Sequence, residues 1–184
     1  MGQRDILRLI AKLLAKAKIP YLLTGSFAVS YYGFPRATHD IDFIIETMGK
    51  NVHKLYRLIV SLDKSYIVDK QQIKEAVLEP TQFDIFHKES GTKIDFWLTD
   101  DDEFEKIKFK RGREVHVNRQ KVNIISPEDL ILTKLTWCKK IMSERHMQDC
   151  RGIYLIQKEM LDKKYLSSWG NKLGVTDLLE EILK

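Results

Sequence analysis

The sequence has 184 residues, enough for one domain, or a core with an extension, that buries a substantial interior. Hydrophobic residues make up 43% and charged residues 31% of the chain, which is typical of soluble globular proteins. No apolar run approaches the roughly 20 residues that span a bilayer, and residues 1–5 lack the hydrophobic region of a signal peptide. We therefore expect a cytoplasmic protein with no membrane partner. The net charge of +5 is compatible with nucleic-acid binding but is not diagnostic of it.

The first part of the chain contains alternating helix and strand patterns. An apolar stripe within residues 6–14 predicts a helix, and Pro20 ends that region. A short apolar run then ends at Gly25 and is followed by a helix predicted over about 26–32. The alternating pattern that begins at Asp40 predicts the next strand.

The pattern then passes from strands to helices. A helix is predicted over residues 51–62. Four strand-like segments follow, at 83–86, 94–97, 115–117 and 122–125. The first two flank Ser90-Gly91 and predict a hairpin. Ser126 and Pro127 suit the N-cap and first position of a helix, and the sequence after them is helical in character.

These elements predict an α/β (α+β) fold with a mixed β-sheet core and flanking helices. We expect the core to occupy residues 1–125 and a helical C-terminal region to occupy 126–184 and to pack on it. Cys138 and Cys150 lie in helical sequence without metal-ligand spacing, so we interpret them as two buried thiols.

The turn at Gly25 and Ser26 indicates an anion site. A strand-to-helix turn points free backbone N–H groups and the positive end of the helix dipole at a bound anion. Glycine lets a phosphate approach the backbone, and the serine hydroxyl can hydrogen-bond it.

Three aspartates indicate a metal site. Asp40 and Asp42 project to one face of a predicted strand, and carboxylate oxygens are the ligands that Mg²⁺ prefers. Asp95 lies on another predicted strand and can join them, as three carboxylates do when they hold two metals for in-line attack on phosphorus. Asp84 is the alternative third carboxylate, because it also lies on a predicted strand. A solvated strand face is the structural alternative for the Asp40 and Asp42 pair.

The ordered motifs resemble a known family. The chain resembles the DNA polymerase beta-like nucleotidyltransferase superfamily in three motifs, Gly25-Ser26, Arg36-Ala37-Thr38-His39-Asp40-Ile41-Asp42, and Lys93-Ile94-Asp95. Its Arg-x-Thr-x-Asp-x-Asp form resembles the small prokaryotic branch of minimal and abortive-infection toxin-type nucleotidyltransferases. Residues 127–135 and 145–149 resemble the fourth motif of that branch, in which a helix lysine and a following aspartate lie beside the nucleotide.

The resemblance implies a metal-dependent nucleotidyltransferase with Mg²⁺ or Mn²⁺ as cofactor. Such an enzyme transfers a nucleoside monophosphate from an NTP to a hydroxyl acceptor and releases pyrophosphate. The acceptor remains open among an RNA or tRNA end, a protein and a small molecule. The implied catalytic and metal-binding residues are Asp40, Asp42 and Asp95, and the implied nucleotide-binding residues are Gly25, Ser26, Arg36 and Lys134.

Several of these side chains also have a purely structural interpretation. Arg36 can be a loop cation or the partner of an aspartate. Lys134 can be a lysine that extends to the surface. Arg145 and Asp149 are spaced i,i+4, for which an ion pair on one helix is the default. No role is assigned to His39 or His146.

Basic side chains also recur between residues 108 and 121. They are Lys108, Lys110, Arg111, Arg113, Arg119 and Lys121, with Glu114 as the opposing charge. We favour a solvated, lysine-rich hairpin over an edge that contacts the phosphates of an RNA acceptor. Trp97 and Phe109 could stack on a base, although core positions are more usual for both.

Two other functions compete with nucleotide transfer. One is a nucleotide-binding toxin–antitoxin component that acts mainly through a helical partner protein, as superfamily members do. The other is a metal-dependent phosphohydrolase, since carboxylate clusters also serve that chemistry. The three aspartates disfavour a pure binding module, and Gly25-Ser26 ahead of the aspartate pair favours transfer from a nucleotide.

Overall fold

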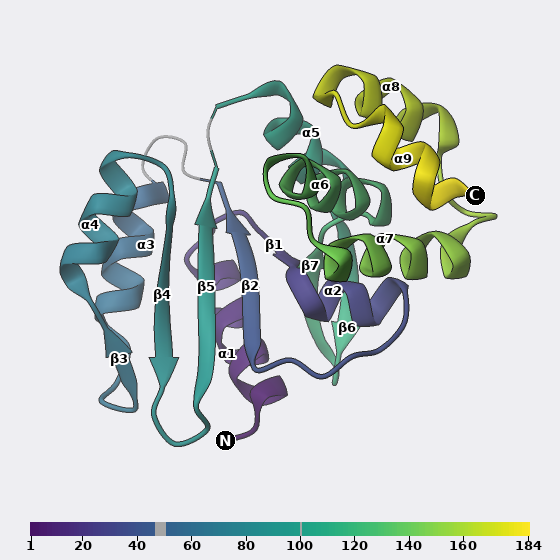
Figure 1. Ribbon diagram of the computed structural model, residues 1–184. Helices are drawn as coiled ribbons and strands as arrows, with labels where there is room; N and C mark the ends of the chain where they lie inside the picture. The colour runs from purple at the N-terminus through teal and green to yellow at the C-terminus, as the bar shows by residue number, and fades with distance from the viewer. Residues whose placement is uncertain (47–50, 100) are drawn as a thin grey trace.

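The computed structural model describes residues 1–46, 51–99 and 101–184. Within those ranges the strands form one seven-stranded mixed sheet in the order β3-β4-β5-β2-β1-β7-β6 (Figure 1). The strands are β1 (Tyr21–Thr24), β2 (Asp40–Ile45), β3 (Tyr66–Val68), β4 (Gln82–His87), β5 (Thr92–Leu98), β6 (Arg113–Val117) and β7 (Gln120–Ile124). The helices are α1 (Gln3–Lys16), α2 (Gly25–Tyr32), α3 (Asn51–Val60), α4 (Lys70–Leu78), α5 (Glu103–Arg111), α6 (Pro127–Lys140), α7 (Glu144–Gln157), α8 (Lys163–Leu173) and α9 (Thr176–Leu183).

The mixed sheet confirms the predicted fold class. Its central strands β2 and β5 are parallel, whereas β1 and β4 pair antiparallel with β2 and β5 on either side. The predicted hairpin forms between β4 and β5, and α2 begins at the predicted turn. The two-part division at residue 125 stays a prediction.

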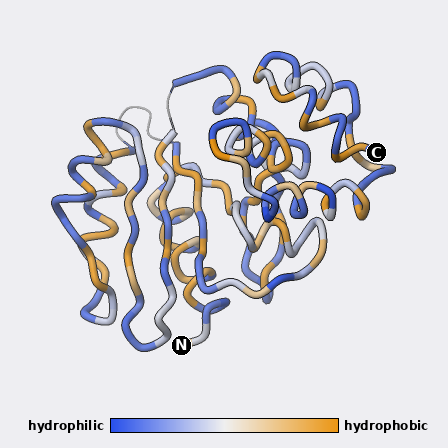
Figure 2. Tube along the Cα trace, in the orientation of Figure 1, coloured by the Kyte–Doolittle hydropathy of each residue, from blue (hydrophilic) through white to orange (hydrophobic). Residues whose placement is uncertain are grey.

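Alternation along the strands gives the sheet one apolar face. Phe83, Phe96 and Phe43 lie on this face. The ring centroid of Phe96 lies 4.9 Å from that of Phe83 and 5.9 Å from that of Phe43. All three side chains are fully buried. Burial of each contributes about 1.5–3 kcal/mol. Hydrophobic residues occur both along the central strands and along the helices, whereas most turns are hydrophilic (Figure 2).

The other face carries the acidic residues of β2 and β5. Helix α6 lies beside this face and packs against α7, and α8 and α9 lie farther from the sheet (Figure 1). Ser126 caps α6 as predicted, because its side chain accepts a hydrogen bond from the Asp129 backbone, and Pro127 stands at the first turn. A strand face and a helix therefore enclose the candidate site.

Three elements were not predicted from the sequence. Strand β3 is only three residues long and pairs with β4 alone, so it carries little periodic signal. Helices α4 and α5 are largely polar, and α5 alternates charged and apolar residues in a way that favours neither period. Among the described residues, no helix is long and apolar enough to cross a membrane.

Candidate functional site

Gly25 and Asp42 are in direct contact at the base of the site. Gly25 adopts a φ of +61°, and a Cβ atom placed on it would lie 1.9 Å from Oδ2 of Asp42. Only glycine fits at this position. Any other residue would be strained at positive φ, and its Cβ atom would displace the Asp42 carboxylate. The turn therefore positions a metal-ligand candidate as well as the start of α2.

Sheet register aligns the acidic residues. Thr24, Asp42, Asp95 and Asp84 are successive partners across β1, β2, β5 and β4. Residues paired in this way point to the same face, about 5 Å from their neighbours. Asp95 therefore lies next to Asp42, and Asp84, the alternative third carboxylate, lies one strand farther away.

Asp95 is engaged by a lysine in the structure. Nζ of Lys93 lies 2.6 Å from Oδ1 of Asp95 and 3.9 Å from Oδ1 of Asp84. Burial raises the pKa of Asp95, and the hydrogen bond and charge of Lys93 only partly offset that effect. Burial lowers the pKa of Lys93, but Asp95 outweighs this and the lysine pKa is raised. The ammonium of Lys93 therefore neutralises part of the charge of Asp95 in this structure.

Asp42 is electrostatically unfavourable in its ionised form. Burial raises the pKa of Asp42, and the neighbouring charge of Asp95 raises it further. Trp97 and Lys134 oppose these effects without cancelling them. A bound cation would favour ionised Asp42.

A second cluster carries positive charge toward the site from α6 and the loop before β2. Nζ of Lys134 lies 2.9 Å from Oδ2 of Asp149, and Nε of Arg36 lies 3.0 Å from Oδ1 of the same carboxylate. The Arg36 pair is two-pronged, since Nη2 also donates to Oδ2 at 3.2 Å. Asp149 therefore fixes two cations from separate segments beside one cleft.

Two structural interpretations from the sequence are wrong. Lys134 is 1% exposed, so it is not a lysine that extends to the surface. Asp149 pairs with Lys134 and Arg36 rather than with Arg145 of its own helix. The reason is tertiary: Asp149 is on the buried side of α7, where α6 and the residue 33–39 loop supply its partners.

The predicted residues line a common cleft, with one exception. Gly25, Ser26, Arg36, Asp40, Asp42 and Lys134 all line a cavity of about 590 Å³. Asp95 is 6% exposed and lies outside this lining, next to Asp42 in register. The structure therefore places two of the three aspartates at the cleft and the third beside it.

The cleft also contains residues to which the sequence assigned no role. Trp137 and His146 line it, with ring centroids 5.4 Å apart. Nδ1 of His146 lies 3.5 Å from Nζ of Lys134, and burial, with the charge of that lysine, lowers the histidine pKa. Trp97 approaches Trp137 from the sheet, with centroids 5.5 Å apart. In the sequence, Trp137 and His146 are notable only for lying near the motifs. Residue spacing along the chain does not predict which parts of β5, α6 and α7 come into contact.

The predicted solvated hairpin accounts for only part of the basic segment. Arg113, Arg119 and Lys121 are exposed on the β6–β7 hairpin, whereas Lys108, Lys110 and Arg111 belong to α5. Lys108 is 3% exposed, belongs to α5 and pairs with Glu105. Arg111 bonds to Glu128 at 3.0 Å. Hairpin β6–β7 begins only at Arg113, so part of the charge is neutralised inside the fold. This weakens the case for an RNA-contacting edge.

The donor set fits a divalent cation. Asp40 and Asp42 share a strand face and both line the cleft, so they offer hard oxygen ligands. In the part of the chain that the structure describes, no group of three or more His, Cys, Asp and Glu residues is already gathered as a metal site. Asp95 lies beside Asp42 in register and can offer its Oδ2 atom, whereas its Oδ1 atom is bonded to Lys93.

Solved structures share this arrangement of elements. ANT(2'')-Ia in complex with adenylyl-2''-tobramycin superposes with a TM-score of 0.63, 12% identity, and coverage of 95% of this chain and 98% of that one. The chain has the nucleotidyltransferase fold. A nucleotidyltransferase-like protein from Paracoccidioides brasiliensis superposes with a TM-score of 0.60 and 16% identity, covering 98% of this chain and 91% of that one. The lincosamide antibiotic adenylyltransferase LnuA, in its lincomycin-bound structure, superposes with a TM-score of 0.56 and 14% identity, covering 85% of this chain and 98% of that one.

These similarities concern the fold and not the reaction. At 12–16% identity, shared architecture does not transfer a substrate or a catalytic residue. No protein-family model and no curated protein matches the chain.

Proposed function

We propose that the protein is a nucleotidyltransferase that transfers a nucleoside monophosphate from an NTP to a hydroxyl acceptor. The observation that supports this best is the joint lining of one cleft by an α-helix N-terminus, a carboxylate pair, the buried Lys134 and the half-buried Arg36. Phosphate binding needs the helix N-terminus and cations, and charge neutralisation at phosphorus needs the carboxylates and their metal. A phosphohydrolase would use the carboxylates but has less need of a dedicated phosphate turn.

The binding roles follow from position. The first N–H groups of α2 and the hydroxyl of Ser26 would hold the triphosphate, with Gly25 giving it access to the backbone. Arg36 and Lys134 would neutralise the negative charge that develops during transfer. Asp149 touches both cations and would orient them, so we regard it as a positioning residue.

The metal-binding roles belong to the aspartates. Asp40 and Asp42, with Asp95, would hold Mg²⁺ or Mn²⁺, which would supply charge neutralisation and lower the pKa of the acceptor hydroxyl. The acceptor oxygen forms a bond to the α-phosphorus, and the bond from that phosphorus to the bridging oxygen breaks. Pyrophosphate leaves, and Asp95 would assist removal of the hydroxyl proton.

We propose a small molecule as the acceptor. ANT(2'')-Ia carries adenylyl-2''-tobramycin and LnuA carries lincomycin in the structures that this fold resembles. The partly internal pairing of the basic segment also gives little support to an RNA acceptor.

Labelled NTPs test the proposal. The protein is incubated with each NTP, Mg²⁺ and a cell extract, which is then separated into small-molecule, protein and RNA fractions. We expect label in the small-molecule fraction, and no label with Asp42→Asn. Label in RNA or protein would correct the acceptor, whereas label in no fraction and no release of pyrophosphate would contradict the proposed reaction.

A further inference from the structure

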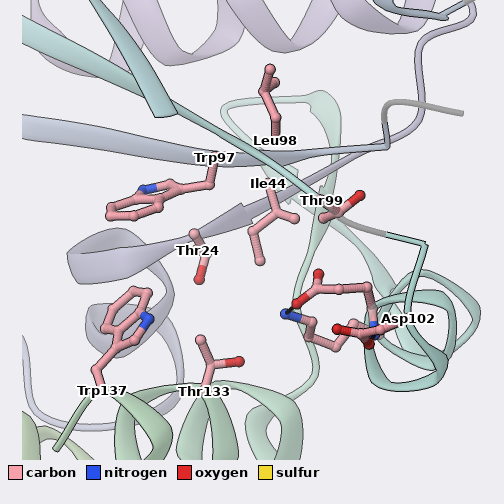
Figure 3. Close-up of a pocket in the computed structure, with 10 residues that line it drawn as sticks. Thr24, Ile44, Trp97, Leu98, Thr99, Asp102, Thr133 and Trp137 are labelled. Carbon is pink, nitrogen blue, oxygen red and sulfur yellow. Dashed lines mark hydrogen bonds and ion pairs between the residues drawn. The ribbon is translucent and has the colours of Figure 1, made fainter. Parts of the chain in front are cut away.

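A second, smaller chamber adjoins the cleft. It has a volume of about 150 Å³ and is enclosed by the ends of β1, β2 and β5, by α5 and by α6. Trp97 and Trp137 line both spaces and so stand between them. Figure 3 shows the two indoles together at one side of the chamber. A cavity of that size accommodates a benzene-sized ring.

The chamber walls carry two buried hydroxyls that have no hydrogen-bond partner within the described ranges. They belong to Thr24, at the end of β1, and Thr133, on α6, which are 1% and 7% exposed. The side chains extend from opposite walls, with the hydroxyl of Thr24 directed toward α6 (Figure 3). An unsatisfied buried hydroxyl costs about 1–3 kcal/mol. A polar ligand in the chamber would remove both costs.

A charged pair completes the polar lining. Lys108 and Glu105, both on α5, line the chamber and are bonded to each other. The lysine side chain is 4% exposed. The pair presents a donor and an acceptor side by side, and the edges of nucleobases also carry adjacent donors and acceptors. The indoles supply aromatic faces of the kind on which bases stack.

The chamber is connected to the phosphate site by the chain itself. Thr24 immediately precedes Gly25 and is the N-cap residue of α2. A group bound in the chamber would thus lie next to a triphosphate on the α2 N-terminus. The chamber has room for one ring system, which leaves the larger cleft for the triphosphate and the acceptor.

We propose that this chamber binds the nucleobase of the NTP and determines which NTP is used. The inference rests on the proposed nucleotidyltransferase function and adds its base-recognition site. The base lies against Trp97 and Trp137, and its polar edge meets Thr133, Lys108 and Glu105.

Calorimetry in Mg²⁺ with the four NTPs and with inorganic tripolyphosphate, which has no base, tests the assignment. Thr133→Val keeps the side-chain shape but removes the hydroxyl, and Lys108→Met removes the ammonium. We expect each variant to bind the preferred NTP about 3- to 10-fold more weakly, the effect of one lost hydrogen bond. Binding of tripolyphosphate should stay within twofold of wild type. Lys106→Met, on the exposed side of α5, is the matched control. It should change neither NTP binding nor tripolyphosphate binding.

The outcomes separate the two proposals. If the wild type binds neither NTP nor tripolyphosphate, the nucleotidyltransferase proposal fails. If the wild type binds both, and Thr133→Val lowers neither NTP affinity nor the preference among NTPs, the base-site proposal is overturned. Equal weakening of NTP and tripolyphosphate also overturns it. If Lys108→Met does not fold, the near-isosteric Thr133→Val still decides the question.

Discussion

A Cβ atom on Gly25 would lie 1.9 Å from Oδ2 of Asp42. The turn that we propose binds phosphate and the strand that we propose binds the metal are therefore fitted to each other at one point. This contact links two motifs that are separate in the sequence. Because of this contact, the steric role of Gly25 can be tested separately from its tolerance of a positive φ.

Gly25→Ala should abolish transfer by moving the Asp42 carboxylate. We expect transfer rates to fall at least about 100-fold, because misplacement by 1 Å costs that much, and stability to fall by about 1–3 kcal/mol. Gly91→Ala is the matched control, since Gly91 has a φ of +63° but a Cβ atom on it would meet nothing within 4 Å. It should lose stability and keep activity, as measured by urea unfolding and pyrophosphate release. Equal activity loss in both variants would attribute the effect to strain alone.

Asp42→Asn should remove transfer and stabilise the unliganded protein. Burial and the charge of Asp95 raise the Asp42 pKa above its unfolded value, so ionisation disfavours the folded state. The destabilisation begins as the pH rises through the unfolded pKa, about 4, and is complete above the folded pKa. At pH 7 the variant should therefore melt at a higher temperature than wild type.

Thermal melts of wild type and Asp42→Asn between pH 3.5 and pH 7 check this sign. The difference in Tm should shrink toward zero as the pH approaches the lower limit. A lower Tm for the variant at pH 7 would instead identify Asp42 as a structural aspartate.

Asp149→Ala should strongly destabilise the fold, because it leaves Lys134 buried without its carboxylate partner. Breaking a buried pair costs about 3–5 kcal/mol. Arg145→Ala should change the free energy of unfolding by less than about 0.5 kcal/mol. Both values come from urea unfolding. Comparable losses of stability in Asp149→Ala and Arg145→Ala would contradict the pairing of Asp149 with Lys134 and Arg36.

A double variant separates the structural and functional roles of this pair. Lys134→Met with Asp149→Leu removes both charges, so it should recover most of the lost stability. NTP binding in Mg²⁺ should stay weak, because Lys134 no longer reaches the phosphates. Recovery of NTP affinity as well would show that Lys134 serves only the fold.

Lys93→Met should strengthen metal binding. Nζ of Lys93 lies 2.6 Å from Oδ1 of Asp95, so its charge and hydrogen bond compete with a metal cation for that carboxylate. We expect Mg²⁺ to bind roughly tenfold more tightly in the presence of NTP, corresponding to about 1.4 kcal/mol. Calorimetric titration of Mg²⁺ measures the change, with Lys106→Met as the control. An unchanged Mg²⁺ affinity would place Asp95 outside the metal site.

The sequence by itself determined the local parts of this protein. Strand alternation indicated that Asp40 and Asp42 share a face, and turn chemistry placed Gly25 and Ser26 at a helix start. These features depend on neighbouring residues and on periods of two or 3.6, so they are visible in a single chain.

Only the tertiary structure decided which distant groups meet. Parallel pairing of β2 with β5 placed Asp95 beside Asp42, and the packing of α6 and α7 on that face brought Lys134 to Asp149. Helix spacing alone favoured Arg145 as the partner of Asp149. Burial overrode that local preference, because a buried carboxylate needs charged or hydrogen-bonding partners, and Lys134 and Arg36 supply them.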